Sequence, residues 1–266
     1  MAVFPAMSPN GDLSQGALER ALDSWVMAVR FLAECDSTNR VAMEWAGRGA
    51  PEGCLVVADY QSVGRGRLGR GWFGPPGQSL LFSLVLRPDL VPARLGLISL
   101  AAGVGLSITL AREGLRARLK WPNDVLVAGR KVAGILSEAR LAGHGRARHA
   151  VVLGVGVNVN VEREAFPDEL RASATSLALE GGRSFDRLDL LAGFLAHFRR
   201  SYATLATARP SVLDAYRGLC DTLGAKIRIE GAQRGFEAVA VDIDANGGLV
   251  LDTGEMVSAG DVVHLR

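Results

Sequence analysis

The segment Gly64-Arg65-Gly66-Arg67-Leu68-Gly69-Arg70-Gly71-Trp72 is the most unusual stretch of the chain. It places three arginines and four glycines within nine residues. Glycine lets backbone N–H groups approach an anion closely, and arginine carries planar donors that suit phosphate. It is not a Walker A loop, because no Gly-Lys-Ser or Gly-Lys-Thr ends it. Its composition leaves two interpretations open: a phosphate-handling loop, or a solvated basic loop that could form a patch for RNA.

Strands are predicted on both sides of this Gly/Arg loop. Leu55–Tyr60 is an apolar strand that runs into the loop, and Ser79–Leu86 is the next strand after it. An uncharged run, Leu95–Ala111, then follows between Arg94 and Arg112. It is barely long enough to span a bilayer and contains serines and glycines, so we expect a buried helix within the core of a soluble protein.

Further elements follow from apolar periodicity along the rest of the chain. Ala150–Val161 alternates strictly, which is typical of a strand, and Asp186–Leu205 carries an apolar stripe at helical spacing. The other predicted elements are helices at 13–29 and 38–45 and strands at 30–35, 118–121, 124–127 and 131–138.

The pattern of the sequence changes after Thr222, where short predicted strands replace the longer elements. Short strands at 225–230, 236–243, 249–252 and 262–265 alternate with turn signals such as Asn246-Gly247-Gly248. We expect a leader at 1–30, a body of strands and helices at 31–219 and a small β-barrel at 220–266.

The composition excludes several classes of protein. Hydrophobic residues make up 48% and charged residues 22% of the 266 residues, as in soluble globular proteins. The net charge of +2 implies no strong attraction to nucleic acid or to an anionic membrane. Three scattered cysteines and four histidines without H-E-x-x-H spacing argue against a disulfide framework or a zinc site. The first residues lack a signal-peptide core, so we expect a cytoplasmic protein with no membrane segment.

Polar groups gather around a proline in a second stretch, Lys120-Trp121-Pro122-Asn123-Asp124. Such a turn is often no more than a turn, although it places a cation, an amide and a carboxylate together. Nearby, Lys131 starts the otherwise apolar run Arg130-Lys131-Val132-Ala133-Gly134-Ile135-Leu136. Lys131 is either a charge that protects a sheet edge or a desolvated cation aimed at a carboxylate or phosphate.

Two more stretches combine small and polar residues. Gly154-Val155-Gly156-Val157-Asn158 lacks the third glycine of a dinucleotide-binding motif and reads as one continuous strand. Its glycines leave one face bare, for either a flat ligand or a neighbouring helix. Ser37-Thr38-Asn39 lies at a predicted helix start, where it either caps the helix or binds a carboxylate or ureido oxygen.

Taken together in this order, these motifs closely resemble the biotin–protein ligase family. The Gly/Arg loop follows an Ala58-Asp59-Tyr60-Gln61 segment, and the K-W-P-N-D, R-K-x-A-G-I-L, G-x-G-x-N and S-T-N motifs are all present. The similarity runs from about residue 31 to the end of the chain. The resemblance implies an α+β fold: a catalytic domain with a mixed β-sheet, related to class II aminoacyl-tRNA synthetases, and a C-terminal SH3-like barrel.

The resemblance also implies the reaction and its residues. Biotin is activated by ATP and Mg²⁺ to biotinyl-5'-AMP, and the biotin is then transferred to a lysine of a biotin carboxyl carrier protein. Arg67, Lys131 and Asp124 would be catalytic. Biotin would contact Ser37, Thr38, Asn39, Gln61, Arg65, Gly66, Arg67 and Lys131. The nucleotide and its magnesium would involve Arg67, Arg70, Trp72, Lys120, Asn123, Asp124 and Asn158, with Asn158 the one side chain expected near the metal.

The sequence also leaves two rival functions to consider, together with DNA binding and the oligomeric state. A lipoate ligase or an acyltransferase of the same fold family is the nearest enzyme alternative. A nucleic-acid-binding protein that uses Arg65, Arg67 and Arg70 is the other, against which the low net charge argues. Some family members carry an N-terminal helix-turn-helix, whereas only 30 residues precede Phe31, so we expect no DNA binding. The protein is expected to be a monomer or a homodimer.

Overall fold

A mixed seven-stranded sheet forms the body of the protein. The computed structural model describes residues 12–141, 149–207, 211–230, 236–258 and 260–265. The strand order is β1-β2-β3-β7-β6-β5-β4, with β1 and β2 parallel and every other neighbouring pair antiparallel. The strands are β1 (Ala28–Cys35), β2 (Cys54–Gln61), β3 (Ser79–Leu86), β4 (Ala117–Lys120), β5 (Asp124–Val127), β6 (Arg130–Arg140) and β7 (Ala150–Asn158). This mixed sheet, packed against helices, confirms the predicted α+β class.

The central strands β3 and β7 are covered on both faces. All eight residues of β3 are buried, which explains why Ser79–Leu86 is apolar almost throughout. Strand β7 is shorter than predicted and ends at Asn158 rather than Val161. The chain leaves the sheet there because the N–H groups of Val159 and Asn160 both turn to the carbonyl of Gln78.

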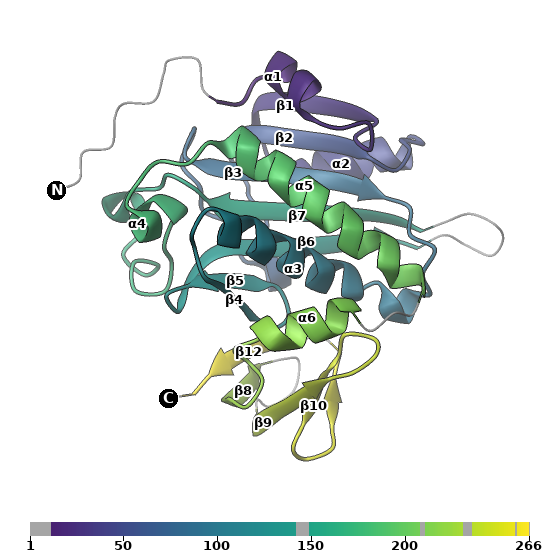
Figure 1. Ribbon diagram of the computed structural model, residues 1–266, viewed down its shortest axis with the longest axis vertical. Coiled ribbons are helices and arrows are strands. Elements are labelled where there is room, and N and C mark those ends of the chain that lie inside the picture. The colour runs from purple at the N-terminus through teal and green to yellow at the C-terminus, as the bar shows by residue number, and fades with distance from the viewer. Residues whose placement is uncertain (1–11, 142–148, 208–210, 231–235, 259, 266) are drawn as a thin grey trace.

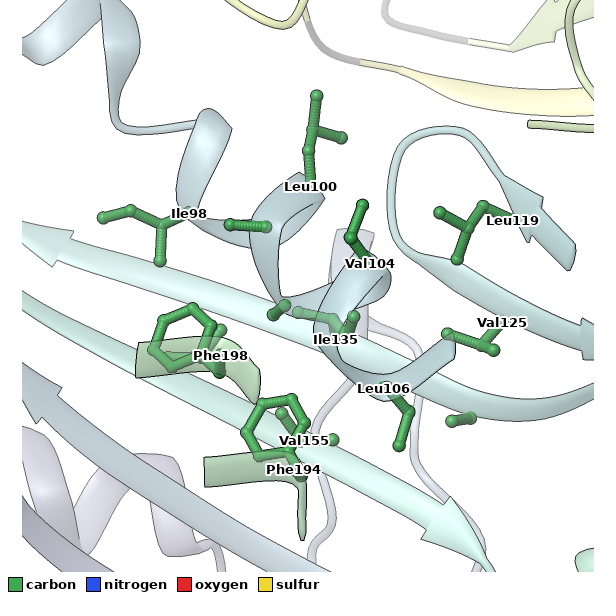
Figure 2. Packing of buried hydrophobic residues seen from close by; sticks show 14 of the residues in the cluster. Ile98, Leu100, Val104, Leu106, Leu119, Val125, Ile135, Val155, Phe194 and Phe198 are labelled. Carbon is green, nitrogen blue, oxygen red and sulfur yellow. The ribbon is translucent and has the colours of Figure 1, made fainter. Parts of the chain in front are cut away.

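Helices α3 (Leu97–Arg112) and α5 (Arg187–Thr204) lie across one face of the sheet (Figure 1). Figure 2 shows Ile98 and Val104 of α3 and Phe194 and Phe198 of α5 packed beside Ile135 and other sheet residues. The segment Pro92–Arg112 is long and apolar enough to cross a membrane, but 67% of its most apolar 18-residue stretch is buried inside the protein. This burial confirms the prediction of a core helix.

The opposite face is only partly covered by a helix. Helix α2 (Thr38–Gly47) packs Ala42 and Ala46 against Val56, Val85 and Val152. Small alanines bring the helix close to the sheet, and α2 packs mainly over β2, β3 and β7, with Asn39 in its first turn reaching β6. The rest of this face, over β7 and β6, is where the Gly/Arg loop lies.

The predicted helix at 13–29 is wrong in its length. Helix α1 covers only Gln15–Ala21, and β1 already starts at Ala28. The Asp23 carboxylate accepts the Trp25 N–H, which forms a turn, and the Met27 N–H then donates to the carbonyl of Gly53. Sheet pairing with a distant segment therefore ends the helix, and the local pattern does not contain that information.

The C-terminal unit is a five-stranded antiparallel sheet of order β11-β10-β9-β8-β12. Two helices absent from the sequence-based prediction precede it, α4 (Leu177–Gly181) and α6 (Ser211–Leu219). In Figure 1, α6 lies between the two sheets. The strands are β8 (Lys226–Glu230), β9 (Phe236–Ile243), β10 (Leu249–Leu251), β11 (Met256–Val257) and β12 (Asp261–His264). Short 3-10 helices are η1 (Arg67–Gly69), η2 (Pro92–Arg94), η3 (Arg163–Ala165) and η4 (Leu205–Thr207).

Trp121 joins the C-terminal sheet to the body. Its backbone N–H donates to the Thr222 hydroxyl at 2.9 Å, and its indole N–H donates to the Gly247 carbonyl at 3.0 Å. The Thr222 hydroxyl also lies 3.0 Å from Nε2 of His264. Burial and nearby Lys120 lower the pKa of His264, so the ring is neutral at pH 7 and Nε2 can accept the Thr222 proton. The two units are thus joined by hydrogen bonds that centre on buried Trp121 and buried Thr222.

Thr222→Val is expected to lower the free energy of unfolding by about 1–3 kcal/mol, because it leaves the buried Trp121 N–H without an acceptor. Urea unfolding measures the change. Thr253→Val, at an exposed turn of the same unit, is the matched control and should cost less than about 0.5 kcal/mol. Equal costs for the two variants would show that Thr222 contributes only its volume.

Candidate active site

The Gly/Arg loop folds into a short hairpin over the sheet. The Gly66 N–H donates to the Arg70 carbonyl at 2.7 Å, and the Trp72 N–H donates to the Gly64 carbonyl at 2.9 Å. At the tip, Gly69 has φ +75°, a conformation that glycine adopts without strain. Arg70 is exposed near this tip. The hairpin therefore presents its arginines around a fixed backbone.

Trp72 covers the bare glycine face that the sequence predicts. A Cβ atom on Gly156 would lie 2.6 Å from Cε2 of Trp72, and one on Gly134 would lie 2.8 Å from Cζ3. The indole thus lies directly on the backbone of β6 and β7. Its Nε1 atom is buried and has no hydrogen-bond partner among the described residues. The sequence predicts either a flat ligand or a neighbouring helix on this glycine face. In this structure the Trp72 side chain covers it instead.

Gly156→Ala is expected to cost about 1–3 kcal/mol of stability, because the new methyl group would overlap the Trp72 ring and force it off the sheet. Thermal and urea unfolding measure the loss. Gly218→Ala in α6 is the control: a Cβ atom there would meet nothing within 4 Å, and alanine favours a helix. A Gly156→Ala variant as stable as the wild type would refute the close packing of Trp72.

Lys131 and Asp124 form an ion pair beside Trp72. The Lys131 Nζ lies 2.5 Å from Oδ1 of Asp124 and 5.7 Å from the centre of the Trp72 ring. Both side chains are partly exposed, at 35% for Lys131 and 22% for Asp124. The backbone of Lys131 pairs with Ser173 and Thr175, which fixes the residue at the start of β6. The pair joins the two motifs that the sequence singles out separately, and it holds a cation at the surface of the site.

Asn123 links the proline turn to the Gly/Arg loop. Its Nδ2 donates to the Ile135 carbonyl at 2.9 Å, while its Oδ1 accepts from the Arg67 guanidinium at 3.2 Å. Arg67 also donates to the carbonyl of Gly260 in the C-terminal unit, at 3.4 Å. Lys120 ends β4 opposite Asp124, in register with it. Arg67 therefore lies where the loop, the turn and the C-terminal unit meet.

The Ser37-Thr38-Asn39 motif starts α2, and Gln61 caps it. Gln61 Oε1 accepts from the Thr38 N–H at 2.7 Å and lies 2.9 Å from the Thr38 hydroxyl. Ser37 occupies the N-cap position without making a side-chain capping bond, so the cap is provided by a side chain 23 residues away. All three motif residues are buried, at 3–4% exposure.

Asn158, Ser79 and Gln78 form a second polar region beside Trp72. Asn158 Nδ2 donates to the Thr175 carbonyl at 3.0 Å, but its Oδ1 is buried without a partner among the described residues. Ser79 Oγ and Gln78 Oε1 are also buried and have no hydrogen-bond partner among the described residues. Ser79 is the register partner of Asn158. Unpartnered buried oxygens at one place are typical of a site that binds a further group.

The predicted site residues lie on one face of the sheet and around its rim. Two residues that the sequence did not single out also belong to this site. Glu138 accepts from Asn39 at 2.8 Å and pairs with Arg65 at 3.4 Å, and Ser83 donates to Asn39 at 2.6 Å. Their partners lie 99 and 44 residues away in the chain, so no local pattern marks them.

Comparison with known proteins gives two family matches on this chain. Residues 32–158 match the Biotin/lipoate A/B protein ligase family, and residues 222–265 match the Biotin protein ligase C terminal domain. The first match covers every motif of the site that lies on the body of the protein.

Individual relatives extend along most of the chain. The biotin–[acetyl-CoA-carboxylase] ligase of Mycobacterium tuberculosis is 37% identical over 246 residues, which cover 88% of each chain. The bifunctional ligase/repressor BirA of Bacillus spizizenii is 35% identical over 92% of this chain and 76% of its own. The solved structure of the Aquifex aeolicus biotin protein ligase with biotin and ATP superposes with a TM-score of 0.76 at 27% identity, over 90% of this chain and 99% of that one. On these similarities, and with the motifs assembled as described, the chain belongs to the biotin protein ligase family.

Proposed function

We propose that this protein is a biotin–protein ligase that forms biotinyl-5'-AMP from biotin and ATP and then transfers the biotin to a lysine of a carrier domain. The observation that carries the proposal is the meeting of the Gly/Arg loop with Lys131 and Asn123 on one face of the sheet. That arrangement surrounds one small region with fixed cations. Two anions that must react with each other require such a region.

The first step joins the biotin carboxylate to the α-phosphate of ATP. A carboxylate oxygen attacks phosphorus, and pyrophosphate leaves with the electrons of the broken P–O bond. Both reactants are negative, so a positive charge that stays close throughout lowers the barrier. Lys131 and Arg67 provide it, since one is anchored by Asp124 and the other by Asn123.

The second step uses the same side chains differently. The neutral amine of a carrier lysine attacks the acyl carbon of the mixed anhydride, the bond from that carbon to the phosphate oxygen breaks, AMP leaves, and the amine proton passes to solvent. Asp124 orients this amine as a hydrogen-bond acceptor. Its carboxylate is 22% exposed, so an incoming group can reach it. Trp72 and the hairpin exclude water, which would otherwise hydrolyse the intermediate.

The substrate contacts divide between two regions. For biotin we propose the start of α2 with Gln61, the near side of the hairpin and Lys131. For the nucleotide we propose the far side of the hairpin, the proline turn and the end of β7. The biotin set is Ser37, Thr38, Asn39, Gln61, Arg65, Gly66, Arg67 and Lys131. The nucleotide set is Arg67, Arg70, Trp72, Lys120, Asn123 and Asn158.

Magnesium fits the site through Asn158. Its Oδ1 is a buried hard oxygen without a partner among the described residues, which suits a small divalent cation. No cluster of three or more His, Cys, Asp or Glu side chains occurs in the part of the chain that the structure describes. We therefore propose that Asn158 and the ATP phosphates hold the ion together. When bound, Mg²⁺ neutralises charge on the departing pyrophosphate.

A cleft between the two units provides a route for the carrier lysine. It encloses about 700 Å³ and is lined by Arg67, Pro122, Asn123, the start of α3 and the loop Asp244–Gly248. Arg67 belongs to the hairpin and also lines this cleft, so a carrier lysine that enters the cleft would reach the acyl group of the intermediate. We propose a biotin carboxyl carrier domain as the partner, residues 31–219 as the catalytic unit and 220–266 as the unit that closes the cleft. We further propose that the protein acts in the cytoplasm.

Biotin-dependent exchange of labelled pyrophosphate into ATP is the expected result of a direct assay. The reverse of the first step regenerates ATP only if the acid has been activated, so the exchange reports adenylate formation without a carrier. Lipoate is the matched alternative substrate, because the family that matches residues 32–158 also includes lipoate ligases. Exchange with lipoate but not with biotin would overturn the substrate assignment, and exchange with neither would overturn the proposed reaction.

A further inference from the structure

Glu138 connects two segments of the proposed biotin site. It lies near the end of β6 with its side chain 29% exposed. One carboxylate oxygen, Oε2, accepts from Asn39 Nδ2 at 2.8 Å, and the other, Oε1, lies 3.4 Å from the Arg65 guanidinium. Asn39 belongs to the first turn of α2, and Arg65 belongs to the Gly/Arg hairpin. A single carboxylate thus bridges elements that are far apart in the sequence.

The orientation of the Asn39 amide is fully determined by its neighbours. Its two N–H groups donate to Glu138 and to the Leu136 carbonyl, at 2.8 and 3.2 Å. Its Oδ1 must therefore face Ser83, whose hydroxyl lies 2.6 Å away. The amide also lies directly against the sheet, since a Cβ atom on Gly154 would come within 1.9 Å of its oxygen. Asn39 has no hydrogen-bonding group left for a ligand other than a second lone pair.

The hydrogen bonds continue from Asn39 to Thr38. An amide oxygen only accepts, so the Ser83 proton is committed to Asn39. Thr38 Oγ1 lies 2.8 Å from Ser83 Oγ and 2.9 Å from Gln61 Oε1. Gln61 Oε1 accepts the Thr38 hydroxyl proton as well as the Thr38 N–H, so in this structure that proton is engaged within the protein. Toward anything in the site, Thr38 can therefore only accept a hydrogen bond.

We propose that Glu138 is a positioning residue that sets the specificity for the head group of biotin. Biotin carries a cyclic urea with two N–H donors, and an acceptor at Thr38 suits such a donor. Glu138 holds the line Asn39–Ser83–Thr38 in place and keeps Arg65 at the same end of the site. This inference rests on the proposed function, and it assigns to Glu138 and Ser83 a role that they exert through other residues.

The effect of Glu138→Ala should appear in the biotin KM. Loss of one charge-assisted hydrogen bond predicts a rise of about 10- to 100-fold in pyrophosphate exchange. Because the hydrogen bond and the ion pair that Glu138 makes among the described residues go to Asn39 and Arg65, both in the biotin set, the KM for ATP and kcat should change less than about threefold. Glu138→Gln keeps an acceptor for Asn39 and loses only the pairing with partly exposed Arg65, so its biotin KM should rise by only about threefold.

Ser83→Ala interrupts the same line without touching Glu138, and it should raise the biotin KM by a similar factor. In the Ser83→Ala/Glu138→Ala double variant the two factors should not multiply, since both changes free the same amide. Glu237→Ala is the matched control: it removes a carboxylate that pairs with Lys226 and Arg228 in the C-terminal sheet, and it should leave both KM values unchanged.

Thermal unfolding of every variant, and the wild type in the same assay, separate the outcomes. A wild type without biotin-dependent exchange overturns the proposed function and this inference with it. An active wild type with an unchanged biotin KM in folded Glu138→Ala overturns the inference alone. Parallel increases in the KM for biotin and for ATP would also overturn it, because they would indicate a general loss of structure. If Glu138→Ala does not fold, Ser83→Ala decides by the same criteria: a selective rise of about tenfold or more in its biotin KM supports the role, and an unchanged biotin KM refutes it.

Discussion

Replacement of Arg67 by glycine is expected to release biotinyl-5'-AMP into solution while leaving part of its synthesis intact. Arg67 lies where the hairpin, the proline turn and the C-terminal unit meet, and its guanidinium already bridges Asn123 and Gly260. A guanidinium in that place can hold the acyl and phosphate oxygens of a mixed anhydride with paired donors. Each such bond contributes roughly 1.5–3 kcal/mol, so the loss of one or two predicts release faster by about tenfold to several hundredfold.

Free adenylate acylates any exposed lysine, which makes its escape measurable. The Arg67→Gly enzyme is mixed with biotin, Mg-ATP and albumin, and the albumin is blotted for biotin. Arg116→Gly removes an exposed arginine directly before β4, outside the site, and is the matched control. If albumin stays unlabelled while a carrier domain is biotinylated at the normal rate, Arg67 is only a structural residue of the loop.

Arg187→Met is expected to cost about 3–5 kcal/mol of folding free energy, the largest effect that we predict outside the active site. Arg187 starts α5 and is only 1% exposed. It donates to Asp12 at 2.7 Å, to Asp59 of β2 at 2.8 Å and to the Ser79 carbonyl at 3.1 Å. Burial lowers the pKa of Arg187, but its hydrogen bonds and charge interactions with Asp12 and Asp59 raise it more, so the side chain stays charged. Removing it leaves two carboxylates facing each other without a counter-charge.

Arg199→Met on the same helix provides the comparison. Arg199 pairs with Asp23 at 3.1 Å, but the two side chains are 49% and 57% exposed, so its loss should cost less than about 1 kcal/mol. Chemical denaturation of both variants gives the two values. Similar losses for Arg187→Met and Arg199→Met would contradict the role of buried Arg187 and its two carboxylate partners, Asp12 and Asp59.

The sequence predicts best those elements whose own residues decide them. Ser79–Leu86 and Asp124–Val127 are strands with the predicted bounds. The apolar run defines the first strand, and the short run after the proline turn defines the second. The helix expected at 13–29 stops at Ala21 because the chain after it pairs with Gly53, which a local pattern does not reveal. Helix α6, with nine residues, is too short for its apolar spacing to stand out.

The candidate site follows the same division. The motifs identified Lys131, Asn123 and Arg67, and the fold brings them to one place through contacts that the motifs alone do not specify. Glu138 and Ser83 of the site, and Arg187 outside it, escaped notice because their partners are 44 to 175 residues distant. Charged and hydroxyl side chains of this kind have no sequence signature until the sheet register places them opposite each other.

Mass spectrometry of a carrier domain tests the central claim most directly. The protein is incubated with biotin, Mg-ATP and a biotin carboxyl carrier domain, and parallel samples omit ATP or replace biotin by lipoate. A biotin–protein ligase predicts that the carrier gains the mass of one biotinyl group on a single lysine, and only when biotin and ATP are both present. A carrier whose mass is unchanged with biotin and ATP, or which gains a lipoyl group instead, would contradict the account.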